Sequence, residues 1–120
     1  MGEMCKSFSF LFERNGENQG GIMTNLERDF QRKVIKELKD TFPGCIVLKN
    51  DPDYIQGIPD LTVLYKDKWA SLEIKKDETS KKQPNQEHYV NVMDEMSFSR
   101  FIYPENKEEV FNELQHAFES

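Results

Sequence analysis

Two acidic residues and a lysine occupy positions from which they could bind a divalent cation and a phosphate. Asp60 opens one apolar run, and Glu73 and Lys75 lie in the next. Only the short polar turn 66–68 separates the two runs, so we expect them to form adjacent antiparallel strands. Two carboxylates and an ammonium on neighbouring strands are the groups that metal-dependent hydrolysis of a phosphodiester needs.

The length of this turn fixes the register of the expected hairpin. A two-residue turn at 66–67 places Asp60 directly opposite Glu73, and a four-residue loop at 65–68 gives the same register. Directly opposed residues of an antiparallel pair point to one face, with Cβ atoms roughly 4.5–5.5 Å apart. Lys75 shares this face because it is two residues from Glu73.

Facing carboxylates repel each other unless a cation lies between them. Mg²⁺ or Mn²⁺ would remove this repulsion, and such cations prefer oxygen ligands. The expected ligands are the Asp60 and Glu73 carboxylates, the backbone carbonyl of Ile74, water and a substrate phosphate. Lys75 would then lie near the attacking water or the charge that develops on the phosphate. The alternative is an ion cluster on a solvated sheet face, but the apolar residues beside these positions indicate a buried sheet.

Two further polar residues are candidates for the same site. Glu27 lies near the centre of the apolar stripe of a helix expected over 25–40, where it could be a further metal or water ligand. It also matches a capping box with Thr24, and both interpretations stay open. Gln86 opens a second predicted helix and could hold the scissile phosphate or orient Lys75. In the alternative interpretation, Gln86 bonds the free backbone amides of the first helical turn.

The other residue types that often do chemistry show no catalytic pattern. His88 lies one residue off the apolar face of its helix, and His116 has no apparent partner. A Ser-His-Asp or Cys-His mechanism therefore finds no support. Cys5 and Cys45 have no zinc-type spacing, no phosphate-binding glycine-rich loop is present, and nothing indicates an organic cofactor.

Length and composition favour one acidic domain. The chain has 120 residues and a net charge of −6, and no apolar stretch approaches the roughly 18 residues that span a bilayer. We expect a flexible leader over 1–22, one domain over 23–120, and a cytoplasmic location. An acidic chain is not typical of a passive nucleic-acid coat protein. Six lysines nevertheless crowd one third of the chain and could follow a phosphate backbone: Lys66, Lys68, Lys75, Lys76, Lys81 and Lys82.

The hydrophobic periodicity predicts the order αβββαβα, which is an α/β fold with a small mixed sheet flanked by helices. The expected helices are Asn25–Asp40, Asn85–Met96 and one that starts near Asn106. The expected strands are Cys45–Leu48, Asp60–Tyr65, Trp69–Lys75 and Phe101–Tyr103.

Apolar residues at helical spacing indicate which helix faces are buried. Leu26 begins the predicted stripe of the first helix, in which apolar residues recur every four positions, and Met96 ends the stripe of the second. Asn106 is expected to cap the last helix, with Glu109 as its reciprocal partner.

The order of these motifs resembles that of the PD-(D/E)XK nuclease superfamily. The motifs are Gly57-Ile58-Pro59-Asp60, then Glu73-Ile74-Lys75, then Gln86-x-x-Tyr89, after an acidic first helix. Within the superfamily the chain looks most like the small stand-alone VRR-NUC type and related phage-encoded nucleases and junction resolvases. The resemblance covers about Asn25 to Tyr103.

The resemblance implies a restriction-endonuclease-like αβββαβ core, followed here by an extra C-terminal helix. It implies an endodeoxyribonuclease that needs Mg²⁺ or Mn²⁺, with branched or junction DNA among its substrates, and small domains of this kind often act as homodimers. Glu27, Asp60, Glu73 and Lys75 would form the core of the site, and Gln86 would support them. The alternative function is a non-catalytic DNA-binding or assembly module that retains the fold and acts without Mg²⁺.

Overall fold

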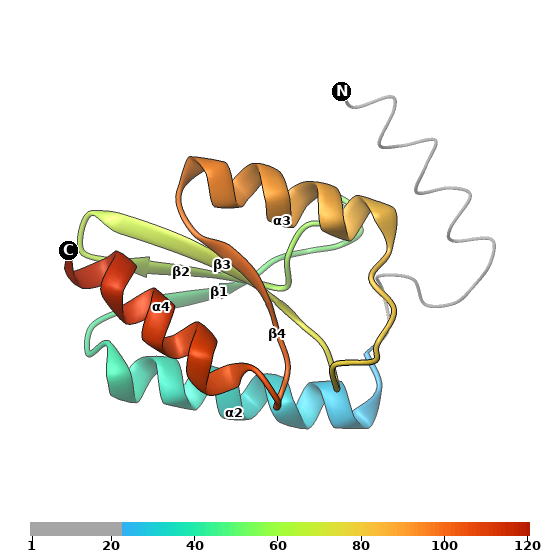
Figure 1. Ribbon diagram of the computed structural model, residues 1–120, viewed down its shortest axis with the longest axis horizontal. Helices are drawn as coiled ribbons and strands as arrows, with labels where there is room; N and C mark the ends of the chain where they lie inside the picture. Colours follow the sequence, from blue (N-terminus) through green and yellow to red (C-terminus); the bar gives the residue numbers. More distant parts are fainter. Residues whose placement is uncertain (1–22) are drawn as a thin grey trace.

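The computed structural model describes residues 23–120, so the predicted leader lies outside the described residues. The elements follow in the order α2 (Asn25–Thr41), β1 (Ile46–Lys49), β2 (Leu61–Tyr65), β3 (Lys68–Ile74), α3 (Pro84–Met96), β4 (Ser99–Ile102) and α4 (Lys107–Glu119) (Figure 1). This order confirms the predicted αβββαβα arrangement and the α/β class. In the described part of the chain, no helix has the length and apolar character needed to cross a membrane.

The four strands form one mixed sheet in the order β1-β2-β3-β4. β1 pairs with β2 and β2 with β3 in antiparallel fashion, whereas β3 and β4 are parallel. A parallel pair needs a crossover connection, and α3 provides it between β3 and β4. The small mixed sheet that the periodicity predicted is therefore present.

The β2–β3 hairpin has the register that the turn length predicted. Leu61 lies opposite Leu72, so the next step along the hairpin places Asp60 opposite Glu73. Lys66 has a φ of 58°, the left-handed conformation that a tight two-residue turn requires and that Gly or Asn usually supplies. The hairpin therefore closes with the shorter of the two predicted turns.

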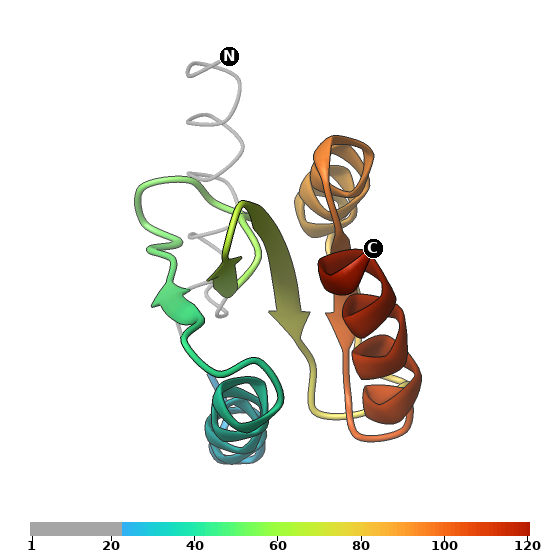
Figure 2. The same ribbon diagram turned by 90° about the vertical axis from the view of Figure 1, so that its left-hand side faces the viewer.

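Helices α2 and α4 cover one face of the sheet, and α3 covers the other (Figure 2). On the first face, alternate residues of β2 and β3 pack with the two helices into a core of Phe30, Val34, Leu38, Phe42, Leu61, Val63, Ala70, Leu72, Ile74, Phe98, Ile102, Val110, Phe111, Leu114 and Phe118. On the second face, the Ser71 and Ser99 hydroxyls are hydrogen-bonded at 2.6 Å, and Ser71 also contacts Met93 of α3. Because side chains alternate along a strand, Glu73 and Lys75 also lie on the α3 face.

Two predictions about residues near helix ends are wrong, and a third is correct only in part. Leu26 is 67% exposed, because a spacing of four residues turns by about 40° per step around a helix and carries Leu26 away from the buried centre of the stripe. Met96 is 68% exposed, and it lies about 120° around α3 from the buried Val90. Asn106 is the N-cap residue of α4, as predicted, but its side chain forms no capping bond, because it accepts the Tyr103 N–H at 2.9 Å instead.

The observed ends of the elements lie within two residues of the predicted ends, and the difference is clearest at β4. This strand begins at Ser99 rather than at Phe101, because its parallel pairing with β3 already starts at Ser71. Ser99 and Arg100 are polar, so they do not extend the apolar run from which the strand was predicted.

Candidate active site

Hydrogen bonds from Asn50 fix the backbone around Asp60, immediately before β2. The Asn50 side chain donates a hydrogen bond to the Pro59 carbonyl at 2.8 Å. The Asn50 N–H donates to the Asp60 carbonyl at 2.8 Å, which continues the antiparallel β1–β2 pairing by one step. The Asp60 carboxylate in turn accepts the Ile74 N–H at 2.8 Å. Asp60 therefore lies at the end of β3, in contact with Glu73.

β3 carries the other two charged groups of the site. The Glu73 and Lys75 side chains are 4% and 7% exposed, so both charges are buried. The Lys75 N–H donates to the Ile102 carbonyl at 2.9 Å, which extends the pairing with β4 to this position. A buried charge is strongly unfavourable unless it is paired and hydrogen-bonded, so the partners of these two side chains decide what the site can do.

Gln86 connects Glu73 to Lys75. Its side-chain nitrogen donates to Glu73 Oε2 at 3.0 Å, and its Oε1 accepts from Lys75 Nζ at 2.8 Å. The same Oε1 accepts the Gln83 N–H at 3.0 Å, and Lys75 Nζ also donates to the Lys81 carbonyl at 2.9 Å. The donor end of the amide faces a carboxylate and the acceptor end faces an ammonium, so one orientation satisfies every contact. Gln86 therefore bonds Lys75 and also a backbone amide at the start of α3, and a role in holding a phosphate stays a prediction.

Burial and repulsion raise the pKa values of both carboxyls. The pKa of Asp60 rises from 3.8 to about 6, mainly because burial disfavours its charge, although the Ile74 N–H and the Lys75 ammonium oppose the rise. The pKa of Glu73 lies well above its usual value of 4.5, first because of burial and then because of the Asp60 charge. Two acids held in this way favour a proton or a cation between them.

Glu27 forms the capping box of α2 that the sequence allowed. The Thr24 N–H donates to Glu27 Oε1, and the Glu27 N–H donates to Thr24 Oγ1, both at 3.1 Å. The Glu27 charge also contributes to the raised pKa values of Asp60 and Glu73, so Glu27 lies close to the pair. Within residues 23–120, no group of three or more His, Cys, Asp or Glu side chains is arranged to hold a metal ion. A ligand role for Glu27 therefore stays a prediction.

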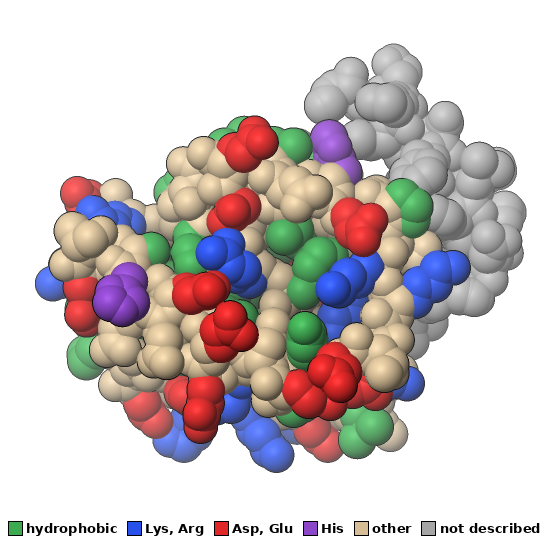
Figure 3. All heavy atoms as spheres, in the orientation of Figure 1, with side chains coloured by type: hydrophobic (Ala, Val, Ile, Leu, Met, Phe, Trp, Pro, Cys, Tyr) green, Lys and Arg blue, Asp and Glu red, His purple; other side chains and the backbone are tan. Residues whose placement is uncertain are grey.

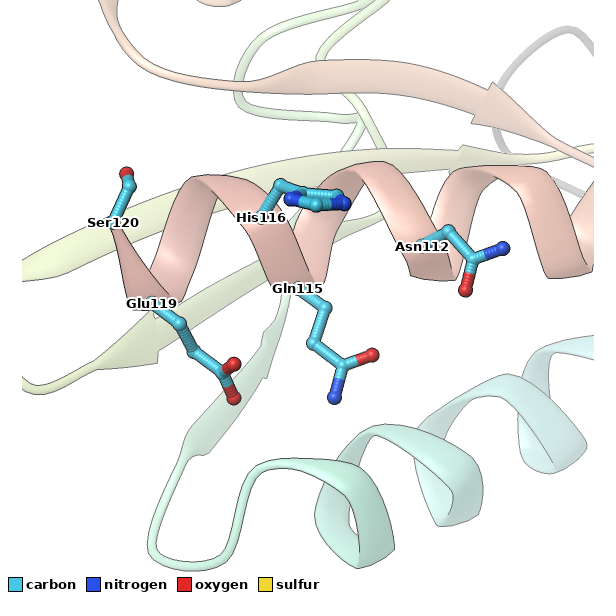
Figure 4. Close-up of a pocket in the computed structure, with 5 residues that line it drawn as sticks. All are labelled: Asn112, Gln115, His116, Glu119 and Ser120. Atoms are coloured by element: carbon cyan, nitrogen blue, oxygen red, sulfur yellow. The ribbon is translucent and has the colours of Figure 1, made fainter.

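Neither histidine lies at this cluster. His116 lines a hollow on α4, which covers the opposite face of the sheet, together with Asn112, Gln115, Glu119 and Ser120 (Figure 4). His88 is exposed on α3 and packs edge-on against Tyr89, with the ring centroids 5.0 Å apart. The carboxylate pair therefore has Lys75 as its cationic neighbour, as the sequence predicted, and no imidazole.

Three groups that hold the site together leave little or no signal in the sequence. One is the Asn50 side chain, whose only signal is that a polar residue directly follows the apolar strand β1. The others are the Lys81 carbonyl and the Gln83 N–H. They leave no signal in residue type, because any residue supplies a backbone carbonyl and nearly any supplies an N–H.

Comparison with known proteins identifies no relative. No protein-family model matches the chain, and no match was found among curated proteins or among solved structures. The function therefore has to follow from the geometry and chemistry of the site.

Exchanging Gln86 for glutamate is expected to weaken the site. Gln86→Glu keeps an acceptor for Lys75 Nζ but places a carboxylate oxygen against Glu73 Oε2, where the amide nitrogen now donates at 3.0 Å. We expect the pKa of Glu73 to rise further, as seen in a carboxyl ¹³C titration, and any metal-dependent activity to fall by about 10–100-fold. Gln115→Glu, on the exposed side of α4, is the matched control. An unchanged Glu73 titration would contradict the bridging role of Gln86.

Proposed function

We propose that this protein is a Mg²⁺- or Mn²⁺-dependent endodeoxyribonuclease of the PD-(D/E)XK type. The observation that carries the proposal is the facing carboxylate pair of Asp60 and Glu73, which Gln86 links to the buried Lys75 ammonium. The order of the three motifs along the chain and the αβββαβα arrangement around them support the same function.

The residues at the pair fit a divalent cation. Burial raises the pKa values of both acids, and a cation at the pair would replace the proton and relieve the repulsion. Asp60 and Glu73 would hold it with the Ile74 carbonyl, and Glu27 is a further candidate. A pair is sufficient, because Mg²⁺ usually keeps several waters and takes one or two protein carboxylates. When bound, the cation would polarise a phosphoryl oxygen and lower the pKa of bound water.

Lys75 is the protein's own source of positive charge at the site, in addition to the bound cation. An ammonium has three N–H donors, and the Lys81 carbonyl and Gln86 Oε1 take two of them. The third serves a phosphate oxygen as negative charge develops on it. In the hydrolysis of the phosphodiester, the oxygen of water bonds to phosphorus and the bond from phosphorus to the leaving sugar oxygen breaks. A proton from the water ends on that leaving oxygen.

We propose DNA, including branched or junction DNA, as the substrate. Lys76, Lys81 and Lys82 are exposed in the segment between β3 and α3, directly beside Lys75. The Lys82 ammonium lies 4.9 Å from the centre of the Phe101 ring, which helps to hold this lysine in place. Acidic and basic side chains are otherwise interspersed over the face shown in Figure 3, so phosphate contacts should concentrate at these lysines. The proposal includes a homodimer, which would present two sites to two DNA strands, and a cytoplasmic location.

A non-catalytic DNA-binding or assembly module is the second candidate. The observation that favours it is that the Glu27 carboxylate already accepts a hydrogen bond from the Thr24 N–H in the capping box of α2. In the part of the chain that the structure describes, no third acidic, histidine or cysteine side chain completes a metal cluster. Such a module would bind its partner equally well in EDTA.

Metal dependence of DNA cleavage tests the proposal directly. Supercoiled plasmid, and then flap and four-way junction DNA, would be incubated with the full chain in Mg²⁺, Mn²⁺ or EDTA. We expect nicking or linearisation of at least one substrate in Mg²⁺ or Mn²⁺ and none in EDTA. Binding without cleavage of every substrate in every cation would contradict the nuclease and favour the binding module.

A further inference from the structure

We propose that the contact between Gly57 and Asn85 is a positioning lock, which sets the spacing between the two halves of the active site. This inference rests on the proposed function of the Asp60–Glu73 pair. Asp60 enters the site from the β1–β2 loop, three residues after Gly57. Gln86, which holds Glu73 and Lys75, directly follows Asn85 in the first turn of α3.

Gly57 lies too close to Asn85 to be replaced by any larger residue. A Cβ atom at Gly57 would lie 2.8 Å from both Cγ and Nδ2 of Asn85, and 2.9 Å from its backbone carbonyl carbon. Because one of these atoms is backbone, a movement of the Asn85 side chain alone could not make room. The β1–β2 loop correspondingly lies beside the N-terminal end of α3 (Figure 1). The loop and the helix are therefore in direct contact at the point where each delivers a residue to the site.

Stability does not explain the asparagine at this contact. Asn85 is 9% exposed, and its Oδ1 has no hydrogen-bond partner among the described residues. The neighbouring Gln56 Oε1 is buried and unpartnered in the same way. A buried carbonyl without a partner lowers the stability of the folded state. An asparagine that holds a loop against a helix while its own carbonyl stays unpartnered is what a positioning role predicts.

The lock affects the reaction because each of the two carboxylates is attached to a different side of the contact. The loop side ends at Asp60, which accepts the Ile74 N–H at 2.8 Å, and the helix side holds Glu73 through Gln86 at 3.0 Å. A shift of the loop against the helix would change the separation of the two acids without removing either. A misplacement of about 1 Å is enough to lower a catalytic rate by about 10²-fold.

The first test compares two glycine substitutions that share the same backbone strain. Gly57 and Gly44 have φ values of +93° and +91°, but a Cβ at Gly44 has no atom within 4 Å. Gly44→Ala therefore carries the strain without the clash. For Gly57→Ala we expect kcat to fall by about 100-fold while KM for DNA changes by less than about threefold, and for Gly44→Ala we expect nearly unchanged kcat. Equal effects of the two substitutions on kcat would overturn the lock.

Asn85→Ala is the second variant, and it decides the matter if Gly57→Ala fails to fold. We expect an unchanged or higher Tm, because the unpartnered carbonyl is removed, together with a kcat lower by about tenfold. Amide hydrogen exchange at Ile74, whose N–H the Asp60 carboxylate accepts, should become faster. A loss of Tm with wild-type Ile74 exchange would indicate ordinary packing and overturn the lock.

The Ile74 exchange measurement separates this inference from the proposed function, because it needs neither DNA nor metal. If the wild type cuts no DNA but Asn85→Ala still speeds exchange at Ile74, the nuclease proposal fails and the positioning of Asp60 by the contact stands. If the wild type cuts DNA and Asn85→Ala has wild-type kcat and wild-type exchange, the nuclease stands and the lock is overturned.

Discussion

Glu73→Gln is expected to remove metal-dependent cleavage and at the same time to make the metal-free protein more stable. Glutamine has nearly the same shape as glutamate but does not offer the anionic oxygen that a hard cation prefers. We expect the cleavage rate to fall by on the order of 10³-fold or more. Glu73 is 4% exposed, and burial together with the Asp60 charge raises its pKa. Removing this carboxyl relieves the repulsion, so Tm in EDTA should rise.

The opposite signs of these two effects make the prediction specific to an active site. A residue that serves only the fold would lose stability and activity together when it is changed. Glu87→Gln is the matched control, because Glu87 is exposed in the first turn of α3, next to Gln86, and loses the same formal charge. Plasmid nicking in Mg²⁺ and thermal unfolding in EDTA measure the two effects. Wild-type cleavage by Glu73→Gln would remove this pair from the chemistry and with it the nuclease proposal.

The carboxylate pair could be predicted from the sequence because its geometry is local. The turn at 66–67 joins two strands that pair with each other directly, so its length alone decides which residues face one another. Asp60 then falls opposite Glu73, and alternation along β3 brings Lys75 to the same face. Each of these steps needs only residues within one hairpin, so which residues face one another does not depend on the docking of distant elements.

The partners of the pair could not be predicted because they depend on how separate elements pack. Gln86 reaches Glu73 and Lys75 only after α3 docks on β3, and the direction of its amide depends on both contacts. Asn50 reaches Pro59 only because the β1–β2 loop folds back on itself. Periodicity identifies the buried face of an element, but it does not say which atoms of two elements meet.

Without metal, the free energy of unfolding is expected to fall as the pH rises from about 4 to about 7. The folded-state pKa of Asp60 is raised from 3.8 to about 6, so its contribution to stability is fully present below pH 3.8 and is lost as the pH rises through about 6. The loss amounts to up to about 3 kcal/mol at neutral pH. The raised pKa of Glu73 adds a loss of the same sign that begins above its usual value of 4.5.

Asp60→Asn isolates this effect from the other groups that titrate. Asp77, for example, has a pKa lowered mainly by its hydrogen bond from Thr79, and it therefore contributes stability above its unfolded pKa that is lost as the pH falls. Because asparagine resembles a protonated aspartate, wild type and variant should be about equally stable at pH 4 and diverge as the pH rises, with the variant more stable. Urea unfolding in EDTA from pH 4 to pH 8 measures the divergence.

Wild type and Asp60→Asn also test whether the titrating carboxylates bind the cation. Protons and a divalent cation compete for the same two carboxylates, so Mg²⁺ should stabilise the wild type increasingly as the pH rises through about 6 and should stabilise Asp60→Asn much less. Asp53→Asn, at an exposed position of the β1–β2 loop, should follow the wild type at every pH with and without Mg²⁺. Parallel stability curves for wild type and Asp60→Asn would mean that Asp60 is not held as a strained acid. A pH-dependent divergence that Mg²⁺ does not reduce would mean that the strain exists but that the pair does not bind the cation, which is the behaviour expected of the non-catalytic module.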